Sequence, residues 1–542
     1  MARADKVPDA RPQVGQRSGR GIMHASSMPA GHAMWNQLIQ LSFRSKVGLQ
    51  AQIREMLVAA ILDGHIPVGV ALPSTRVLAA QLGVARNTVA LAYELLVNEG
   101  YLLTKSRSGH FVNPEIVAGR AGLPSPARGG ASPAPAQWTQ RYRGAVSAQR
   151  NIVKPRDWQR YPYPFIYGQI DPSQLPMPGW RECSLQATSA SEVRGWAADL
   201  FDGDDALLIE QIQTRLLVRR GVFVSPEEIL VTVGAQHALF MLGTLLVDAG
   251  TTVGIENPGY PDARNIFAAR TSNVVPLPLD GSGLALSPAL DRCDYVYLTP
   301  SHQCPTNVTM PLARREALLA WAQANDRVLI EDDYEIELGF EGRAHPALQS
   351  LDRSGHAIYV SSLSKTLAPG IRIGFIVANR DLIRELRALR RLMLRHPAAN
   401  NERSVGLFLA MGYHDALLRR LRQAYAERSQ RMAAALAHHL PQVTFTTVAG
   451  ASSYWLRFPE HVDTRALARE AASLGVLIEP GDVFFDANAT EPVPFNYARL
   501  GFASIDASRI DAGLATLALA CSNERRVTHA TSSPHPALPQ QD

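Results

Sequence analysis

Between about residue 161 and residue 521, short apolar runs alternate with stretches of helical periodicity, and this alternation restricts the possible folds more than any other feature. The apolar runs are only four or five residues long: Ile229–Val233, Thr252–Glu256, Tyr295–Thr299, Val328–Asp332 and Ile358–Ser361. Runs of this length separated by helices are typical of parallel strands joined by helical crossovers. The sequence therefore predicts an α/β fold with a mostly parallel sheet.

The composition agrees with a folded protein. Apolar residues make up 46% of the 542 residues, which is too much for a disordered chain. The longest apolar stretch, residues 229–247, is interrupted by Gly234, Gln236 and His237, so we expect a strand, a turn and a helix rather than a membrane span.

Localisation is inferred from the first residues and from the cysteines. The first twenty residues contain no apolar segment of the kind found in secretory signals. The four cysteines show no CxxC spacing, which argues against a zinc ribbon, a redox dithiol or a disulfide scaffold. We therefore expect a cytoplasmic protein without contact to membranes and without a metal.

Charge and composition divide the chain into five parts. We expect a disordered leader over 1–36, a compact block over 37–113, a linker over 114–160, a large domain over 161–521 and a disordered tail over 522–542. The first 113 residues carry 12 basic and 6 acidic side chains, whereas the rest has a net charge of −1. A basic N-terminal block suggests a polyanionic partner, although charge alone is equally compatible with a solvated basic arm.

The compact block has the pattern of a winged helix-turn-helix. Helical spacing is found over 50–64, 75–82 and 85–99, with Ser74 as a helix cap and Gly83 in the short turn between the second and third helices. Two apolar segments around a basic tip follow and predict a β-hairpin wing.

The exposed residues of this block suit double-stranded DNA. The third helix would present Arg86, Asn87 and Thr88 at its N-terminus, where a recognition helix meets base edges and phosphates. Arg76 on the preceding helix would reach the phosphate backbone, and Arg107 at the wing tip would reach a minor groove. The alternative is a small helical module with solvated arginines.

The same block resembles the winged-helix domain of the GntR family. The resemblance rests on Leu72-Pro73-Ser74-Thr75-Arg76, on Leu82 to Val89 and on Glu99-Gly100, within about 65 residues. In that family the arginines that match Arg76 and Arg86 contact DNA.

In the large domain, the string from Ser361 to Gly374 carries the strongest chemical signal. A predicted strand leads to Lys365, which has Ser362 and Ser364 before it and Arg372 seven residues after it. A partly desolvated lysine can form a Schiff base with an aldehyde cofactor, and the serines and the arginine suit a phosphate.

Two further segments fit an aromatic, phosphorylated cofactor. Asp332 at a strand end can pair with a protonated ring nitrogen, and Tyr334 can hydrogen-bond a ring hydroxyl. Alternatively, the adjacent Asp332 and Asp333 would bind Mg²⁺, and Tyr334 would be an amphipathic core residue. Upstream, Ala235 and Gln236 open a helix after a glycine, and a helix N-terminus can bind a phosphate.

Together these segments resemble the fold-type I aminotransferases, which use pyridoxal 5′-phosphate (PLP) and contain a small C-terminal α/β subdomain. With the N-terminal block, roughly residues 45–505 are similar to the MocR/GabR-type regulators. The resemblance implies that Lys365 forms the internal aldimine with PLP. It also implies the roles of the remaining cofactor contacts: Asp332 at the ring nitrogen, Tyr334 at the ring hydroxyl, Ser362, Arg372, Ala235 and Gln236 at the phosphate, and Tyr260 near the ring.

The resemblance also assigns Arg499 to the carboxylate of an effector, for which an ordinary ion pair at a strand end is the alternative. The chain departs from the family pattern at Asn307, which replaces a glycine, at Cys304, which replaces an aromatic residue, and over Asp202–Glu210. Asn tolerates a left-handed backbone, so we expect the turn at Asn307 to persist.

The combined interpretation is a transcriptional regulator that binds an operator and senses an amine, an amino acid or PLP itself. Family members are typically homodimers, so the resemblance implies a homodimer on two half-sites. The alternatives are an active PLP-dependent aminotransferase with an accessory DNA-binding domain, and a regulator whose PLP site has decayed.

Overall fold

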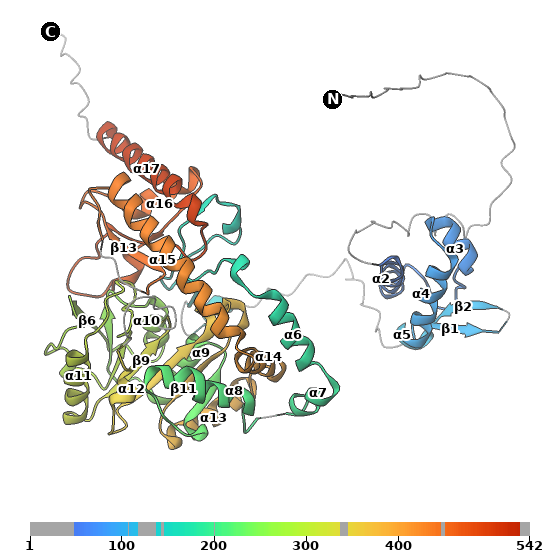
Figure 1. Cartoon of the computed structure of the whole chain (residues 1–542), viewed down its shortest axis with the longest axis horizontal. Coiled ribbons are helices and arrows are strands. Elements are labelled where there is room, and N and C mark those ends of the chain that lie inside the picture. The colour runs from blue at the N-terminus through green and yellow to red at the C-terminus, as the bar shows by residue number, and fades with distance from the viewer. Residues whose placement is uncertain are drawn as a thin grey trace, which may run out of the picture. The chain divides into compact units, whose positions relative to one another are not determined.

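The structure is a computed structural model that describes residues 48–106, 108–117, 137–142, 146–199, 201–335, 345–445 and 450–531. It contains two compact units that divide between residues 141 and 142. Each unit is described by itself (Figure 1).

The N-terminal unit combines three longer helices and one short one with a two-stranded wing. Its helices and strands are α2 (Leu49–Leu62), α3 (Thr75–Leu82), α4 (Arg86–Asn98), β1 (Leu102–Lys105), β2 (Gly109–Val112) and α5 (Pro114–Val117). Local signals define the two central helices: Ser74 caps α3 through a bond from the Val77 N–H (3.3 Å), and Gly83 ends α3 at φ +64°. This confirms the predicted winged helix-turn-helix.

The large unit is built around an eight-stranded sheet with the strand order β4-β11-β10-β9-β8-β5-β6-β7. The strands are β4 (Ile229–Thr232), β5 (Val253–Asn257), β6 (Val274–Asp280), β7 (Gly283–Leu284), β8 (Tyr295–Leu298), β9 (Val328–Asp333), β10 (Ala357–Ser362) and β11 (Gly374–Val377). β11 runs antiparallel to both of its neighbours, and β7 runs antiparallel to β6. The sheet is therefore mostly parallel, as predicted.

Helices cover this sheet. The α-helices of the large unit that precede its C-terminal subdomain are α6 (Met177–Ala187), α7 (Ala190–Trp196), α8 (Ala206–Gln211), α9 (Ala235–Leu246), α10 (Pro261–Ala268), α11 (Leu312–Ala324), α12 (Leu348–Leu351), α13 (Arg380–Leu394), α14 (Ala399–Ala410) and α15 (Tyr413–His439). Apolar residues of α9, α10 and α13 pack with β4, β5 and β10 in one core. β4 and β11 are buried along their whole length. Burial on both faces of the sheet explains why such strands are continuous apolar runs in the sequence.

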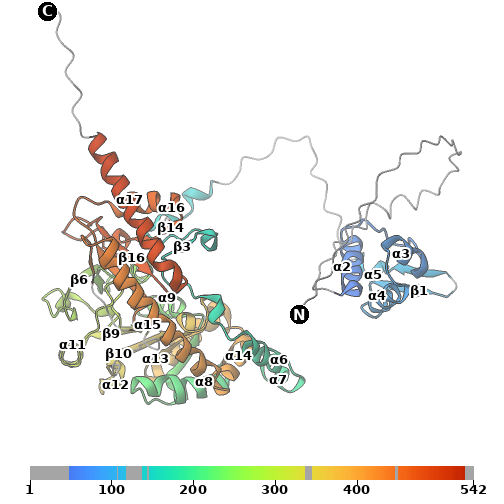
Figure 2. The same cartoon turned by 45° about the horizontal axis from the view of Figure 1, so that its top comes forward.

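A smaller C-terminal subdomain follows α15. Its four-stranded sheet has the order β12 (Thr444–Phe445), β13 (Ser453–Arg457), β16 (Tyr497–Gly501) and β15 (Glu479–Pro480). The helices α16 (Thr464–Ser473) and α17 (Ile510–Thr531) complete it, and α15 and α17 lie side by side in both views (Figures 1 and 2). A short strand, β14 (Val476–Leu477), pairs with β3 (Tyr163–Pro164).

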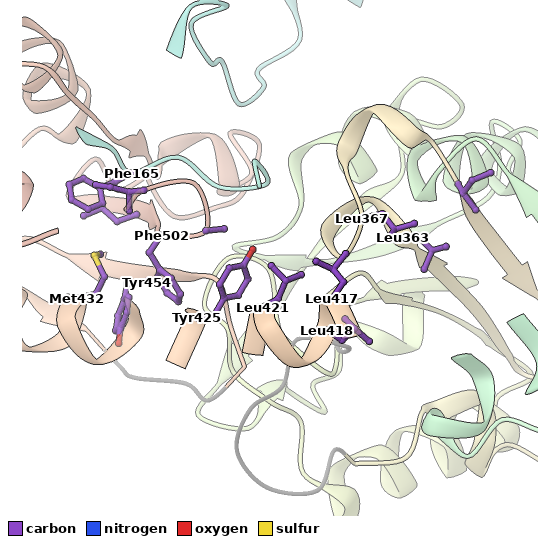
Figure 3. Close-up of a cluster of buried hydrophobic side chains, with 14 of the residues drawn as sticks. Phe165, Leu363, Leu367, Leu417, Leu418, Leu421, Tyr425, Met432, Tyr454 and Phe502 are labelled. Atoms are coloured by element: carbon purple, nitrogen blue, oxygen red, sulfur yellow. The ribbon is translucent and has the colours of Figure 1, made fainter. Parts of the chain in front are cut away.

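The largest hydrophobic core joins this subdomain to the loop that carries Lys365. Figure 3 shows Leu363 and Leu367 beside Leu417, Leu418 and Leu421 of α15. Tyr425, Met432, Tyr454 and Phe502 continue the same cluster. The lysine loop is therefore anchored on both sides of Lys365 by buried leucines.

Two segments differ from the expected boundaries. α17 continues to Thr531, beyond the tail boundary expected at 521, because Glu524, Arg525 and Arg526 are good helix formers. Residues 146–160, expected within the linker, belong to the large unit and contact it. The leader over 1–36 and most of the remaining linker lie outside the described residues. None of the helices in the described part of the chain has the length and hydropathy that a membrane crossing requires.

Candidate functional site

A cavity of about 330 Å³ opens at the carboxyl ends of the parallel strands. The nine residues predicted for the cofactor and the effector all line it: Ala235, Gln236, Tyr260, Asp332, Tyr334, Ser362, Lys365, Arg372 and Arg499. Ligands bind at this edge of α/β sheets because loops and helix N-termini converge there. The folding of the chain therefore gathers into one site residues that span about half of the sequence.

Lys365 is one of the residues that line the cavity. Its Nζ lies 4.3 Å from the centroid of the Tyr167 ring. A Cβ built on Gly168, which has φ +76°, would lie 2.6 Å from that Nζ, so only glycine leaves room for the lysine. Burial, and then the nearby charge of Lys154, lower the pKa of Lys365 to about 8.

Asp332 faces the cavity from the end of β9. Its Oδ2 accepts a hydrogen bond from the Tyr297 hydroxyl (2.9 Å), whereas its buried Oδ1 has no hydrogen-bond partner among the described residues. Burial raises the pKa of Asp332 to about 7. A buried carboxylate oxygen without a partner suits a cationic N–H group from a ligand.

An anion-binding arrangement lies at another end of the cavity, where β4 leads into α9. Gly234 precedes the helix with φ +81°, and a Cβ there would lie 2.7 Å from Nη2 of Arg372. Arg372 has φ +54° and donates from Nη2 to the Val233 carbonyl (2.8 Å). Ser362 and Ser364 line the same cavity and are joined by a 2.9 Å bond between their hydroxyls. The helix N-terminus and the guanidinium together suit a phosphate.

The two predicted tyrosines are held by neighbouring groups. The hydroxyl of Tyr334 donates to the His302 carbonyl (2.9 Å), and that of Tyr260 donates to Asp262 (3.0 Å). Asn307 has φ +62°, which confirms that the turn persists without glycine. Cys304 is buried in the cavity wall, where burial raises the pKa of its thiol to about 12.

Arg499 forms the ion pair that was the alternative from the sequence, and it also lines the cavity. In this buried pair, its Nε donates to Glu479 (2.8 Å). The guanidinium lies 4.1 Å from the centroid of the Tyr167 ring and 4.7 Å from that of Phe484. Two aromatic rings therefore fix the orientation of the arginine.

Asp332 and Asp333 do not form a metal site. Asp333 instead pairs with Arg220 (Nε to Oδ2, 2.6 Å), away from Asp332. Within the described ranges, no group of three or more His, Cys, Asp or Glu side chains is arranged to hold a metal ion.

Sequence reasoning missed several residues of the cavity, among them Lys154 and Tyr167, as well as Glu479 behind it. Glu479 and Tyr167 carry no local motif. Lys154 carried one signal: the chain contains only five lysines among 54 basic residues, so a lysine in the large unit is unusual.

The helix-turn-helix unit presents the predicted DNA-binding residues at its surface. Arg76, Arg86 and Asn87 are exposed, and Thr88 is half-buried. The Nε of Arg86 lies 3.5 Å from the hydroxyl oxygen of Thr75, so both helices contribute to one surface. Arg107 lies outside the described residues.

Family models match both units. The model for bacterial regulatory proteins of the gntR family matches residues 49–112, and the model for aminotransferase class I and II matches residues 200–517.

Two curated relatives match nearly the whole chain. The HTH-type transcriptional regulator TauR of Rhodobacter capsulatus is 41% identical over 472 residues, which are 87% of this chain and 96% of TauR. The probable rhizopine catabolism regulatory protein MocR of Rhizobium meliloti is 31% identical over 513 residues, which are 92% of this chain and 99% of MocR.

A solved structure matches the large unit. It is LysN, an alpha-aminoadipate aminotransferase from Thermus thermophilus complexed with N-(5′-phosphopyridoxyl)-L-leucine, with a TM-score of 0.65 and 28% identity. The match covers 72% of this chain and 100% of LysN.

Fold, site and relatives define a DNA-binding transcriptional regulator with an aminotransferase-like domain of fold type I, whose cofactor is PLP. The chain belongs to the MocR-type regulators of the GntR family. The partnerless oxygen of Asp332 and the anion-binding arrangement at Arg372 fit the ring nitrogen and the phosphate of this cofactor.

Proposed function

We propose that the cavity holds PLP through a covalent bond to Lys365 and responds to an amine or amino acid by changing the affinity of the protein for its operator. The observation that carries the proposal is the partnerless, buried oxygen of Asp332 in the same cavity as Lys365 and Arg372. A nitrogen cation, an aldehyde and a phosphate are the three groups that such a set of side chains accommodates.

When bound, PLP supplies an aldehyde that bonds reversibly to amines and a ring that withdraws electrons. Lys365 presents an amine that loses its proton near pH 8, because burial lowers its pKa to about 8. Asp332 would balance the charge of the ring nitrogen, and Tyr334 would lie at the ring hydroxyl. Arg372 and Ser362, with Ala235 and Gln236 at the start of α9, would bind the phosphate, and Tyr260 would flank the ring.

An incoming amine would replace Lys365 while its acidic group docks on Arg499, a role that suits a planar, bidentate guanidinium. Such a ligand changes DNA affinity only if it binds one conformational state more tightly than another. Arg76, Arg86, Asn87, Thr88 and Arg107 would contact the operator. We expect a cytoplasmic homodimer whose two DNA-binding units contact two half-sites.

The proposal is tested by reducing the purified protein with borohydride and mapping the labelled peptide. We expect a visible absorbance band before reduction and a pyridoxyl group on Lys365 afterwards. A Lys365→Ala variant that keeps the band would refute the assignment.

Transamination is the second candidate function, because the first step of sensing and of catalysis is the same and the large unit resembles an aminotransferase. Fast, complete turnover of an amino donor with a 2-oxo acid would favour an enzyme over a sensor.

A further inference from the structure

Lysine is rare in this chain, and the few lysines are unevenly distributed along it. The sequence contains 49 arginines and five lysines, and only Lys154 and Lys365 lie beyond residue 105. Both line the same cavity. A Cβ on Gly168 would lie 2.6 Å from Nζ of Lys365 and 3.6 Å from Nζ of Lys154, so the two amino groups approach the same point of the chain.

Lys154 belongs to a charged cluster at the wall of the cavity. Its Nζ lies 3.2 Å from Oε1 of Glu479 and donates to the Tyr167 carbonyl. The other oxygen of Glu479 accepts the 2.8 Å bond from Arg499. Glu479 and Arg499 are 3% and 4% exposed, and Lys154 is 24% exposed.

The cluster contains two cations and one carboxylate. Burial acts to raise the pKa of Glu479, but Arg499 and Lys154 beside it hold that pKa below its usual value, so Glu479 stays ionised. Among these three side chains, one positive charge has no carboxylate to balance it, which is unfavourable in a largely buried position unless an anion joins it. Nε of Arg499 is bound to Glu479 and Nη1 lies 3.9 Å from Sγ of Cys304, so a ligand would meet the remaining N–H groups of the guanidinium.

We propose that Lys154 is a specificity-determining residue of the effector site and that, with Arg499, it selects amines that carry one acidic group over amines that carry none. The inference rests on the proposed function of the cavity and narrows its ligand to the amino acid class. A monoanionic group would neutralise the cluster, whereas a plain amine would leave its excess charge in place.

The position of Lys154 is fixed by the residues just before it. Arg150 donates from Nη2 to the backbone carbonyl (2.7 Å) and to the carboxylate (2.9 Å) of Asp482, and its own carbonyl accepts from Asn265 (3.0 Å). Asn151 donates to Asp262, which also accepts from Tyr260 in the cavity. Because this segment is the first part of the large unit in sequence, an effector that touches Lys154 touches the residues that follow the DNA-binding unit along the chain.

The test compares two changes at one position. Lys154→Gln keeps a donor for the Tyr167 carbonyl and removes the charge, whereas Lys154→Arg keeps the charge. Arg160→Gln is the matched control, since Arg160 lies in the same segment with its side chain 84% exposed. Each PLP-loaded, full-length variant is titrated with the twenty amino acids and β-alanine, and with the amines that result from removal of their acid group. L-Alanine and β-alanine share ethylamine as their acid-free counterpart.

The readout is the change in cofactor absorbance, with thermal denaturation as a second measure of binding. We expect Lys154→Gln to weaken binding of the responsive amino acids about tenfold or more, as for loss of one partner in a buried charge cluster, and to change binding of the plain amines far less. Lys154→Arg and Arg160→Gln should retain the preference for acid-bearing ligands.

Equal losses for amino acids and plain amines in Lys154→Gln, or no loss at all, would overturn the inference and leave the proposed function intact. So would a wild-type protein that binds plain amines as tightly as amino acids. If the band on Lys365 is absent, or if no ligand in the panel changes it, the proposed function fails and this inference with it.

Discussion

Asp332 and Asp333 are consecutive residues of β9, yet their carboxylates serve opposite faces of the sheet. Asp332 lines the cofactor cavity, whereas Asp333 accepts a 2.6 Å bond from Arg220 and a 2.9 Å bond from the Tyr359 hydroxyl. The separation follows from the alternation of side chains along a strand. It provides a matched pair of substitutions that distinguishes cofactor binding from stability.

Replacing Asp332 by Asn should weaken PLP binding. A neutral amide cannot balance a protonated ring nitrogen, so we expect the Kd for PLP to rise about tenfold or more. The measurement is a titration of the apoprotein with PLP by absorbance. Unchanged affinity would show that Asp332 does not contact the ring.

Replacing Asp333 by Asn should instead lower the free energy of unfolding. The change leaves the buried guanidinium of Arg220 without its anionic partner, and breaking such a pair costs about 3–5 kcal/mol. Urea unfolding measures the loss, and the folded variant should still show the cofactor band. An Asp333→Asn variant that no longer binds PLP but keeps its free energy of unfolding would contradict the assignment of Asp333 to stability.

The pKa of Lys365 predicts the pH dependence of cofactor attachment. Only the unprotonated amine attacks an aldehyde, and burial lowers this pKa from 10.5 to about 8. The rate at which apoprotein gains the visible band should therefore rise through about pH 8, whereas a free lysine side chain would respond near 10.5. Lys154→Gln should move the midpoint upward, since the charge of Lys154 contributes to the lowering.

Arg86→Ala should weaken operator binding by about 1–3 kcal/mol, the usual contribution of an arginine that reads a base. Gel-shift titrations at fixed salt concentration measure the effect. Arg54→Ala is the control, because Arg54 in the same unit is paired with Glu99 (2.8 Å). Equal losses in the two variants would contradict the assignment of Arg86 to the recognition helix.

Leu421→Ala tests the anchoring of the lysine loop. Leu421 is buried in the core that also contains Leu363 and Leu367, so the cavity left by truncation should cost about 2–5 kcal/mol of stability (Figure 3). Leu519→Ala on α17 is the control, since Leu519 is 63% exposed and should have little effect. Equal thermal shifts would argue against the role of this core.

Local signals were sufficient for the helix-turn-helix unit, because the Ser74 cap and the Gly83 turn lie within a few residues of the helices that they delimit. The apolar runs likewise predicted β4, β5, β8, β9 and β10. β11 was not predicted, because its four residues follow directly on the motif at Arg372 and its position between β4 and β10 depends on long-range pairing.

For the cavity, the motifs located Lys365, Asp332 and Arg372, each of which stands at the end of a strand or in a recognisable turn. The motifs gave no indication of Glu479 or of the pairing of Asp333 with Arg220. Those contacts join residues far apart in the chain, and no spacing rule relates them.

Finally, each unit has a hydrophobic core of its own. Among the described residues, the core of the N-terminal unit is formed between Ile53 and Val112, with Ile116 among the residues packed against it. A domain whose hydrophobic core is formed by its own residues can be replaced without repacking the core of the other domain. The DNA-binding unit is therefore suited to modular replacement: a chimera that carries a different winged helix ahead of the same large unit should fold, and would place another operator under control of the same ligand.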